Sequence, residues 1–240
     1  DWNNENCREV LFAFPSAKGY SHYVYSGDLF WWTVPARTIA NYLGDTKAGN
    51  GDHNCKYGLA PSFAPDGTPY TTELGRPAAK FKKYPEDYRL KLYRNLGDNK
   101  REGMMLFGYL DYEENGKAKR VVSPTGDVDL YLRDAVGNFK GCGPDEIPAD
   151  RTSDMLHGDH RSGWRFVKYP LYMDTDSGQM ESDFVEIRLA EVIYSLAECK
   201  FREGKVDEAA RLLNTVRRRN YPENAVAKYL YAPEGPVTLT

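Results

Sequence analysis

The chain has 240 residues, with 32 Lys and Arg against 35 Asp and Glu, so its formal net charge at pH 7 is −3. That balance argues against a dedicated nucleic-acid-binding protein, which carries a basic excess. A hydrophobic content of 41% indicates a globular chain rather than a disordered one. No apolar stretch approaches the roughly 18 residues that a membrane-spanning helix needs.

The N-terminal part predicts little regular structure. Residues 8–14 indicate a short strand that ends at Pro15, and residues 15–34 form a loop dense in aromatic side chains. Residues 35–42 predict a short helix. A long polar loop follows over residues 44–67, and loops of that length are usually functional or disordered.

The middle of the chain predicts strands and loops. Residues 104–122 indicate a hairpin, because two strand-like stretches flank Asn115-Gly116, the strongest short hairpin signal. The stretches are Met105–Leu110 and Lys119–Val122. Residues 123–163 are again typical of loops, and the alternation in residues 164–169 predicts a strand.

The apolar period becomes helical from Asp183 to Arg219. Gly204 divides this segment into two helices, and the charges at both ends of the second helix oppose its dipole. An i,i+4 ion pair is expected between Glu198 and Arg202, and another between Asp207 and Arg211. The apolar positions of the first helix are Phe184, Ile187, Ala190, Ile193, Ala197 and Phe201, and those of the second are Val206, Ala209, Ala210, Leu213 and Val216.

These two helices predict an antiparallel hairpin with tetratricopeptide character, since small residues lie where the helices approach each other. A stable array of such units needs about three repeats. One unit would leave apolar surface open, so we expect further repeats elsewhere, N-terminal to residue 1. The chain ends without an obvious closing element, so we expect a piece or a processed form of a longer protein.

The cysteines, histidines and acidic residues do not match the spacings of known metal or redox motifs. Cys7, Cys55, Cys142 and Cys199 are far apart and form no C-x-x-C pair, which excludes the usual zinc and thioredoxin spacings. Cys199 lies in the helical pattern and is expected to be buried. His157, Asp159 and His160 do not match H-E-x-x-H, and the oxygen donors Asp45, Asn50, Asp52 and Asn54 do not match the calcium loop.

The basic residues Arg217, Arg218 and Arg219 are expected to form a solvated helix end. No metal, no cofactor and no catalytic constellation is therefore expected.

The helical segment resembles the SusD/RagB family of Bacteroidota. The resemblance is carried by RLAEVIYSLAE over residues 188–198, then Gly204, then EAARLLNTVRRR over residues 208–219. Cys199 departs from the family, which more often has a small residue there. Weaker features follow in the family's order: the strand at Glu9–Phe12, Pro35 with its helix, the D-x-R-L of Asp87–Leu90, and Ser162-Gly163 with Lys168-Tyr169. The resemblance covers residues 8–222.

The resemblance implies a fold and a role. The fold is expected to be mainly α, with irregular loops and a few short strands. Residues 1–182 would form a loop-rich ligand-binding region, residues 183–222 the helix hairpin, and residues 223–240 a tail leading into a C-terminal segment absent from this chain. The family's members are outer-membrane lipoproteins at the cell surface. They bind oligosaccharides or polysaccharides without catalysis and deliver them to a SusC-like TonB-dependent transporter. The lipid anchor is also expected to be absent from this chain.

The candidate glycan-binding residues lie in the aromatic loop. A sugar offers an apolar C–H face and a rim of hydroxyls, so it binds a flat ring with polar neighbours. Residues 19–32 supply both, and we predict that the glycan contacts are among Tyr20, Tyr23, Tyr25, Trp31 and Trp32. The alternative for each ring is packing in the core.

Two other classes of function stay open. A tetratricopeptide-type surface could hold a protein or peptide as an interaction scaffold. A glycoside hydrolase is also possible, because its paired carboxylates are recognised by their separation in space.

Overall fold

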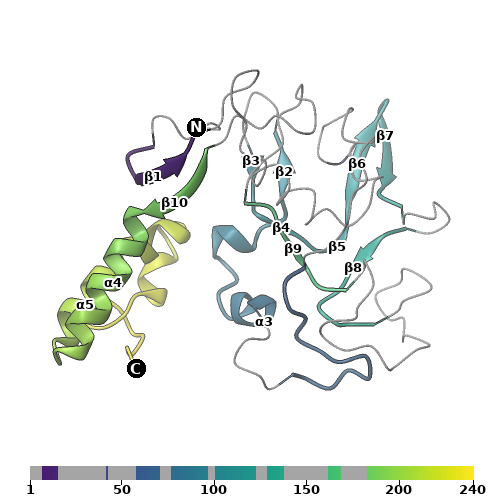
Figure 1. The fold of residues 1–240 in the computed structure, drawn as a ribbon. Helices are drawn as coiled ribbons and strands as arrows, with labels where there is room; N and C mark the ends of the chain where they lie inside the picture. The colour runs from purple at the N-terminus through teal and green to yellow at the C-terminus, as the bar shows by residue number, and fades with distance from the viewer. Residues whose placement is uncertain are drawn as a thin grey trace.

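The computed structural model describes residues 7–15, 42, 58–70, 77–96, 101–122, 129–137, 162–168 and 183–240. Figure 1 shows two parts side by side. One is a helix hairpin with a two-stranded sheet at its upper end, and the other is rich in short strands. Among the described residues, no helix is both long and apolar enough to cross a bilayer.

The strand-rich part consists of short antiparallel pairs. They are β2 (Arg94–Asn95) with β3 (Arg101–Glu102), β4 (Met105–Leu106) with β9 (Arg165–Phe166), β5 (Gly108–Tyr109) with β8 (Tyr131–Leu132), and β6 (Asp111–Glu114) with β7 (Lys117–Arg120). The helix α3 (Pro77–Lys82) and the 3₁₀ turn η3 (Tyr88–Leu90) belong to the same part. Its core is fully buried and mostly aliphatic: Tyr93, Met105, Leu106, Leu110, Val121, Leu130 and Leu132.

The predicted hairpin is confirmed at its turn and wrong in its extent. Asn115 and Gly116 both have positive φ, 54° and 71°, as a type I′ turn requires. The strands run only over 111–114 and 117–120, because Gly108 has φ 65° and bends the chain. Residues before the bend therefore pair elsewhere, with β9 and β8.

The strand predicted at residues 8–14 is confirmed as β1 (Val10–Phe14), which pairs antiparallel with β10 (Phe184–Arg188). The helix predicted from residue 183 is therefore wrong for its first residues. Phe184, Val185 and Ile187 are aromatic or β-branched, and such residues favour a strand when a partner strand is available. The spacing of Phe184 and Ile187 does not distinguish the two structures.

The antiparallel helix hairpin is confirmed as α4 (Leu189–Arg202) and α5 (Val206–Arg217), joined at Gly204 with φ 78°. Both helices bury small residues, and small side chains let two helix backbones approach closely. These are Ala190 and Ala197 in α4, and Ala209 and Ala210 in α5. The predicted Glu198–Arg202 pair forms, with Arg202 Nε 2.9 Å from Glu198 Oε1.

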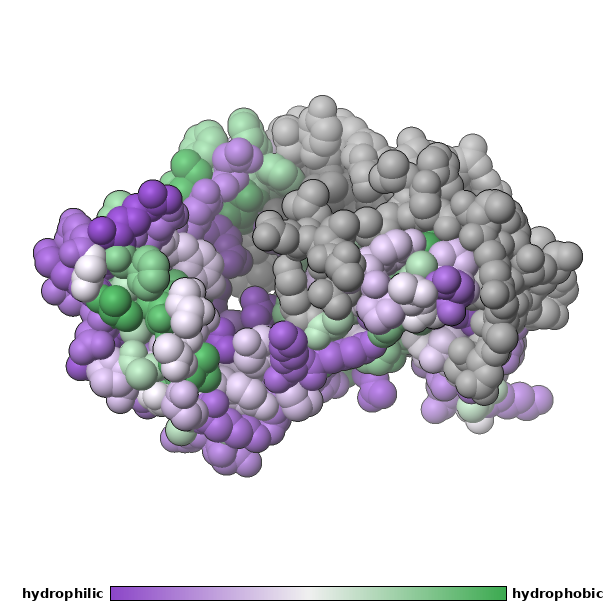
Figure 2. All heavy atoms as spheres, turned by 90° about the horizontal axis from the view of Figure 1, so that it is seen from below, coloured by the Kyte–Doolittle hydropathy of each residue, from purple (hydrophilic) through white to green (hydrophobic). Residues whose placement is uncertain are grey.

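The outer face of α4 is apolar and exposed. Leu189, Val192 and Leu196 follow one another at helical spacing and are 41%, 46% and 46% exposed. Cys199 continues this row and is exposed, so its predicted burial is wrong. Phe201 is also exposed, whereas the buried residues of α4 are the alanines Ala190 and Ala197. Figure 2, seen from below, shows several hydrophobic patches on the part of the molecule that holds the hairpin.

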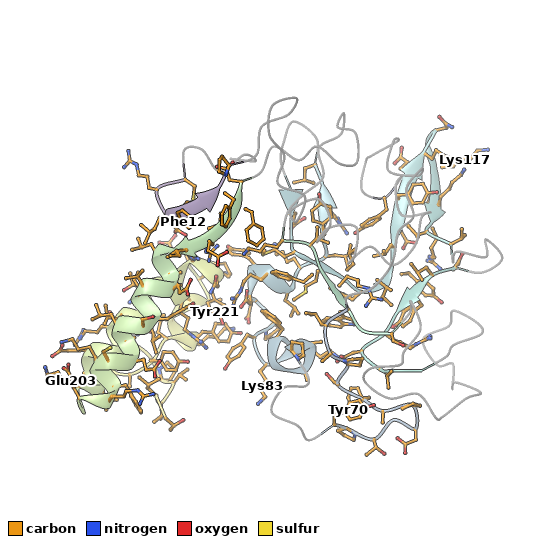
Figure 3. The ribbon with its side chains drawn as sticks, in the orientation of Figure 1. Phe12, Tyr70, Lys83, Lys117, Glu203 and Tyr221 are labelled. Atoms are coloured by element: carbon orange, nitrogen blue, oxygen red, sulfur yellow. The ribbon has the colours of Figure 1, made fainter. Side chains whose placement is uncertain are left out.

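Residues 218–240 turn back along α5 through the 3₁₀ turns η4 (Arg218–Asn220) and η5 (Val226–Tyr229). Three buried residues of this stretch, Tyr221, Ala225 and Tyr229, form a small cluster against which Tyr84 of the strand-rich part packs. The rings of Tyr84 and Tyr229 meet edge to face at 5.8 Å. Figure 3 shows Tyr221 between the hairpin and the strand-rich part, so aromatic contacts join the two parts.

The expectation of a mainly α fold needs a correction. Among the described residues, α-helix is concentrated in residues 189–217, whereas α3 is the only α-helix described within residues 58–168, beside the turn η3 and strands of two to four residues. Short strands of that kind carry too weak a period to be recognised in a sequence.

Candidate functional site

One outer face of the strand-rich part combines tyrosine rings with charged groups. Three segments alternate between core and surface: Tyr109-Leu110-Asp111, Arg120-Val121 and Asp129-Leu130-Tyr131. The central residues Leu110, Val121 and Leu130 are buried, and their backbones are bonded in sequence, Val121 N to Leu110 O at 3.0 Å and Leu130 N to Val121 O at 2.8 Å. Their neighbours must therefore point to the opposite, outer face.

Two tyrosines form the centre of this face. Tyr109 and Tyr131 are cross-strand partners, and their ring centroids lie 4.8 Å apart at an interplanar angle of 70°. Both rings are half-buried, so each keeps part of its surface accessible. An edge-to-face pair of this kind holds both rings in a defined orientation.

A guanidinium covers one of the two rings. Arg120 Cζ lies 4.0 Å from the centroid of Tyr109, which is within the range of a cation–π contact. Arg120 Nε donates to Asp111 Oδ1 at 2.6 Å, and Nη1 donates to Asp129 Oδ2 at 3.3 Å. The hydrogen bond to Asp111 is the main cause that raises the pKa of Arg120. Because these groups are exposed, the ion pairs orient the guanidinium more than they stabilise the fold.

We call Tyr109, Asp111, Arg120, Asp129 and Tyr131 the tyrosine platform. It offers flat aromatic surface, guanidinium N–H donors and carboxylate acceptors within one small area. That combination suits a sugar ring, which presents a C–H face together with hydroxyls that both donate and accept. Among the described residues, Nη2 of Arg120 has no hydrogen-bond partner and is available to a ligand.

The glycan-binding residues predicted from the sequence, Tyr20, Tyr23, Tyr25, Trp31 and Trp32, lie outside the described residues. The weak metal candidates do too, namely His157, Asp159, His160, Asp45, Asn50, Asp52 and Asn54. Within the part of the chain that the structure describes, no group of three or more His, Cys, Asp or Glu could hold a metal ion.

Sequence reasoning missed the tyrosine platform. The signal that could have found it is a pair of mirrored tripeptides, Tyr-Leu-Asp at 109–111 and Asp-Leu-Tyr at 129–131. Each places one apolar residue between two polar or aromatic ones, which is the alternation of a half-buried strand. Three residues are too few to stand out without knowledge of the pairing.

The D-x-R-L segment serves the fold. Asp87 is buried and accepts hydrogen bonds from the backbone N–H of Arg89 at 2.9 Å and from its Nε at 3.0 Å. A second carboxylate oxygen accepts from Arg89 Nη2 at 2.6 Å. This fork-like pair closes the turn η3 and raises the pKa of Arg89.

The second family segment, LNTVRRR at 213–219, also serves the fold. Asn214 is fully buried and bonds the backbone of Tyr231. Arg217 donates through Nε to the carbonyl of Tyr229 and lies over the rings of Tyr84 and Tyr231 at 4.9 and 4.8 Å. The expectation of a solvated basic helix end is therefore wrong for Arg217, which is enclosed by aromatic rings, and confirmed for Arg218 and Arg219, which are exposed. Arg218 and Arg219 pair with Glu234 and Glu9.

The chain thus combines a helix hairpin with a strand-rich part that has an aromatic and polar outer face. The model of the SusD family matches residues 70–232, more than half of the chain, and the chain belongs to the SusD family. Membership implies a glycan-binding role in nutrient uptake. No curated protein matches the chain, and no solved structure does.

Proposed function

We propose that this protein captures oligosaccharides or polysaccharides at the bacterial cell surface and delivers them to a SusC-like TonB-dependent transporter. Membership of the SusD family supports the proposal, and the tyrosine platform is the observation that carries it. A lipid anchor in the outer membrane would hold the protein beside the transporter. The binding step needs no covalent chemistry, so the protein would act without catalysis.

The proposed division of the chain follows from this role. Residues 1–182 would contact the glycan, residues 183–222 would form the supporting hairpin, and residues 223–240 would continue from it. The contacts of Tyr84 with Arg217 and Tyr229, and of Tyr221 with Tyr229, support a rigid connection among the three regions.

Binding is tested by isothermal titration with a panel of oligosaccharides, followed by substitution of the platform rings. We expect Tyr109→Ala and Tyr131→Ala each to weaken binding about tenfold, because each removes stacking surface. The matched control is Tyr112→Ala, which removes the same type of ring from the opposite face of the same strand. The assignment of the platform is wrong if all three variants bind like the wild type.

A parallel experiment tests the aromatic loop. If Trp31→Ala and Trp32→Ala abolish binding while the platform variants do not, the glycan contacts lie at residues 19–32. If both sets weaken binding, one ligand spans both regions. A panel that shows no binding at all contradicts the glycan-binding function.

Delivery requires contact with the transporter. It is tested by isolating outer membranes that carry the tagged full-length protein and identifying a co-purified TonB-dependent transporter. Recovery of the lipidated protein without any such transporter, under conditions that preserve other outer-membrane complexes, contradicts delivery while leaving glycan binding intact.

The exposed apolar row of α4, Leu189, Val192 and Leu196, favours a second candidate function as a protein-interaction scaffold. If the protein is a glycan receptor, replacing the three residues by Gln leaves its glycan affinity unchanged. If it is a scaffold, the same replacement abolishes binding of its protein partner.

A glycoside hydrolase would instead release reducing sugar over time, and we expect no such release.

A further inference from the structure

The β6–β7 hairpin separates its charges between two faces. Asp111 opposes Arg120 and Glu113 opposes Ala118, and these pairs lie on the face of the tyrosine platform. On the other face Glu114 opposes Lys117 and Tyr112 opposes Lys119, and Lys119 also pairs with Glu114. Figure 3 labels Lys117 near the far end of this hairpin, away from the core. The lysines of the hairpin are therefore not on the platform side.

The platform face is acidic. With Glu113 it holds three carboxylates and one guanidinium, which leaves two negative charges. The carboxylates are also the more exposed groups, since Asp111 and Asp129 are 61% and 48% exposed and Arg120 is 37% exposed. Arg133, whose guanidinium lies 5.3 Å from the ring of Tyr131, is only 7% exposed and cannot meet a ligand directly. Including its charge still leaves the face negative.

We infer that the tyrosine platform selects uncharged glycans and rejects those that carry carboxylate or sulfate groups. This inference rests on the proposed function and names the chemical class of its ligand. A sugar hydroxyl can donate to Asp111 or Asp129 and accept from Arg120 without changing the ion pairs. The aromatic rings then cover the C–H face of the same sugar.

An anionic sugar meets two obstacles on this surface. Its charge is repelled by the exposed carboxylates, at a cost of about 1 kcal/mol for each pair of like charges 4 Å apart in water. It can reach Nη2 of Arg120, but a two-point ion pair through Nε and Nη2 requires that it displace Asp111, which already holds Nε at 2.6 Å. Together these effects disfavour an anionic analogue by roughly tenfold or more at low salt.

The experiment compares uncharged hexasaccharides of glucose, xylose, mannose and galactose with galacturonate hexamers and sulfated galactose hexamers, by isothermal titration. We expect the wild type to bind an uncharged hexasaccharide at least about tenfold more tightly than the anionic ones at low salt. In the variant Asp111→Asn, Glu113→Gln, Asp129→Asn the difference should fall below about threefold, because Arg120 is then unpaired.

The matched control removes the same amount of charge far from the platform. The variant Glu186→Gln, Glu191→Gln, Glu223→Gln changes three exposed carboxylates of the other part of the molecule, and it should discriminate like the wild type. Salt gives a readout that needs no substitution. Raising it from about 10 mM to about 1 M shortens the Debye length from roughly 30 to 3 Å, so the discrimination of the wild type should shrink.

Two results overturn the inference: equal or tighter binding of the anionic hexamers by the wild type, or full discrimination retained by the platform variant. Each requires that some glycan binds, so both differ from failure of the proposed function, in which no hexamer binds. Because the substituted groups are exposed, we expect each variant to fold like the wild type. Thermal unfolding of each variant checks this.

Discussion

The side-chain amide of Asn214 pairs with both backbone groups of Tyr231. Nδ2 donates to the carbonyl of Tyr231 at 2.9 Å, and Oδ1 accepts from its N–H at 2.8 Å. Nδ2 also donates to Glu234 Oε2 at 2.8 Å. One residue of α5 thus takes the place of a neighbouring strand for the returning chain.

Replacing Asn214 should destabilise the protein strongly. Asn214→Ala leaves the N–H of Tyr231 without its side-chain acceptor and opens a cavity at a fully buried position, at a cost of roughly 2–4 kcal/mol in the free energy of unfolding. The carbonyl of Tyr231 still accepts from the backbone N–H groups of Glu234 and Gly235. Asn214→Asp keeps the shape but loses the donor and places a carboxylate beside Glu234, so it should cost at least as much. Urea denaturation measures both. Thr215→Ala, which changes an exposed residue of the same turn, should stay within about 0.5 kcal/mol. Equal stability of Asn214→Ala and Thr215→Ala would show that the amide contacts are unimportant.

Arg217 should not be replaceable by lysine. Its planar guanidinium lies over Tyr84 and Tyr231 while its Nε donates to the carbonyl of Tyr229, and an ammonium cannot do both. We expect Arg217→Lys to lower the free energy of unfolding by about 1–2 kcal/mol. Arg211→Lys, on the exposed side of α5, is the control and should be neutral. The prediction is contradicted if denaturant midpoints of the two variants coincide.

Alanine substitutions at Gly103 and Gly67 distinguish two costs to stability: steric crowding of the added Cβ, and backbone strain from a positive φ. Both have positive φ, 68° and 84°, but a Cβ on Gly103 would lie 2.2 Å from the carbonyl oxygen of Leu92, whereas one on Gly67 would meet nothing within 4 Å. Gly67→Ala should therefore cost about 1 kcal/mol from strain alone. Gly103→Ala should cost several times more or prevent folding. Comparable melting temperatures for the two variants would disprove the close approach.

The pair of Glu9 with Arg219 makes a small, pH-dependent contribution to stability. The hydrogen bond from Arg219 lowers the pKa of Glu9 below its usual value of 4.5. A carboxyl group whose pKa is lower in the folded state stabilises the fold above its unfolded pKa, and this contribution is lost as pH falls through the folded pKa. Since the side chain of Glu9 is 44% exposed, solvent screens the pair and we expect less than about 1 kcal/mol.

Thermal unfolding at a series of pH values measures this effect. Glu9→Gln should lower the melting temperature slightly at neutral pH and make no difference in acid well below the lowered pKa. A difference that persists undiminished in acid would mean that the charge of Glu9 is not responsible.

Elements with a local cause could be predicted from the sequence. The hairpin of α4 and α5 follows from a sustained apolar period interrupted by Gly204, and the turn at Asn115-Gly116 follows from the need for two positive φ angles. The family was recognised from the same helical segment, and the match over residues 70–232 confirms it.

Elements that depend on distant partners could not be predicted. Residues 184–188 form a strand only because β1 pairs with them, and the platform exists only because β5 and β8 bring Tyr109 beside Tyr131. Cys199 was expected inside because its position is helical. The apolar period places residues on a face of the helix, however, and it does not say which of two apolar faces packs against the rest of the protein.

The roles of Asn214 and Arg217 have a consequence for how proteins of this kind are compared. Both residues belong to the segment by which the family is recognised, and both direct their polar atoms at the protein's own main chain. The recognition signature therefore describes a shared framework. Two chains that carry this signature can bind different glycans. The residues that determine glycan specificity therefore have to be sought among side chains that the signature does not include.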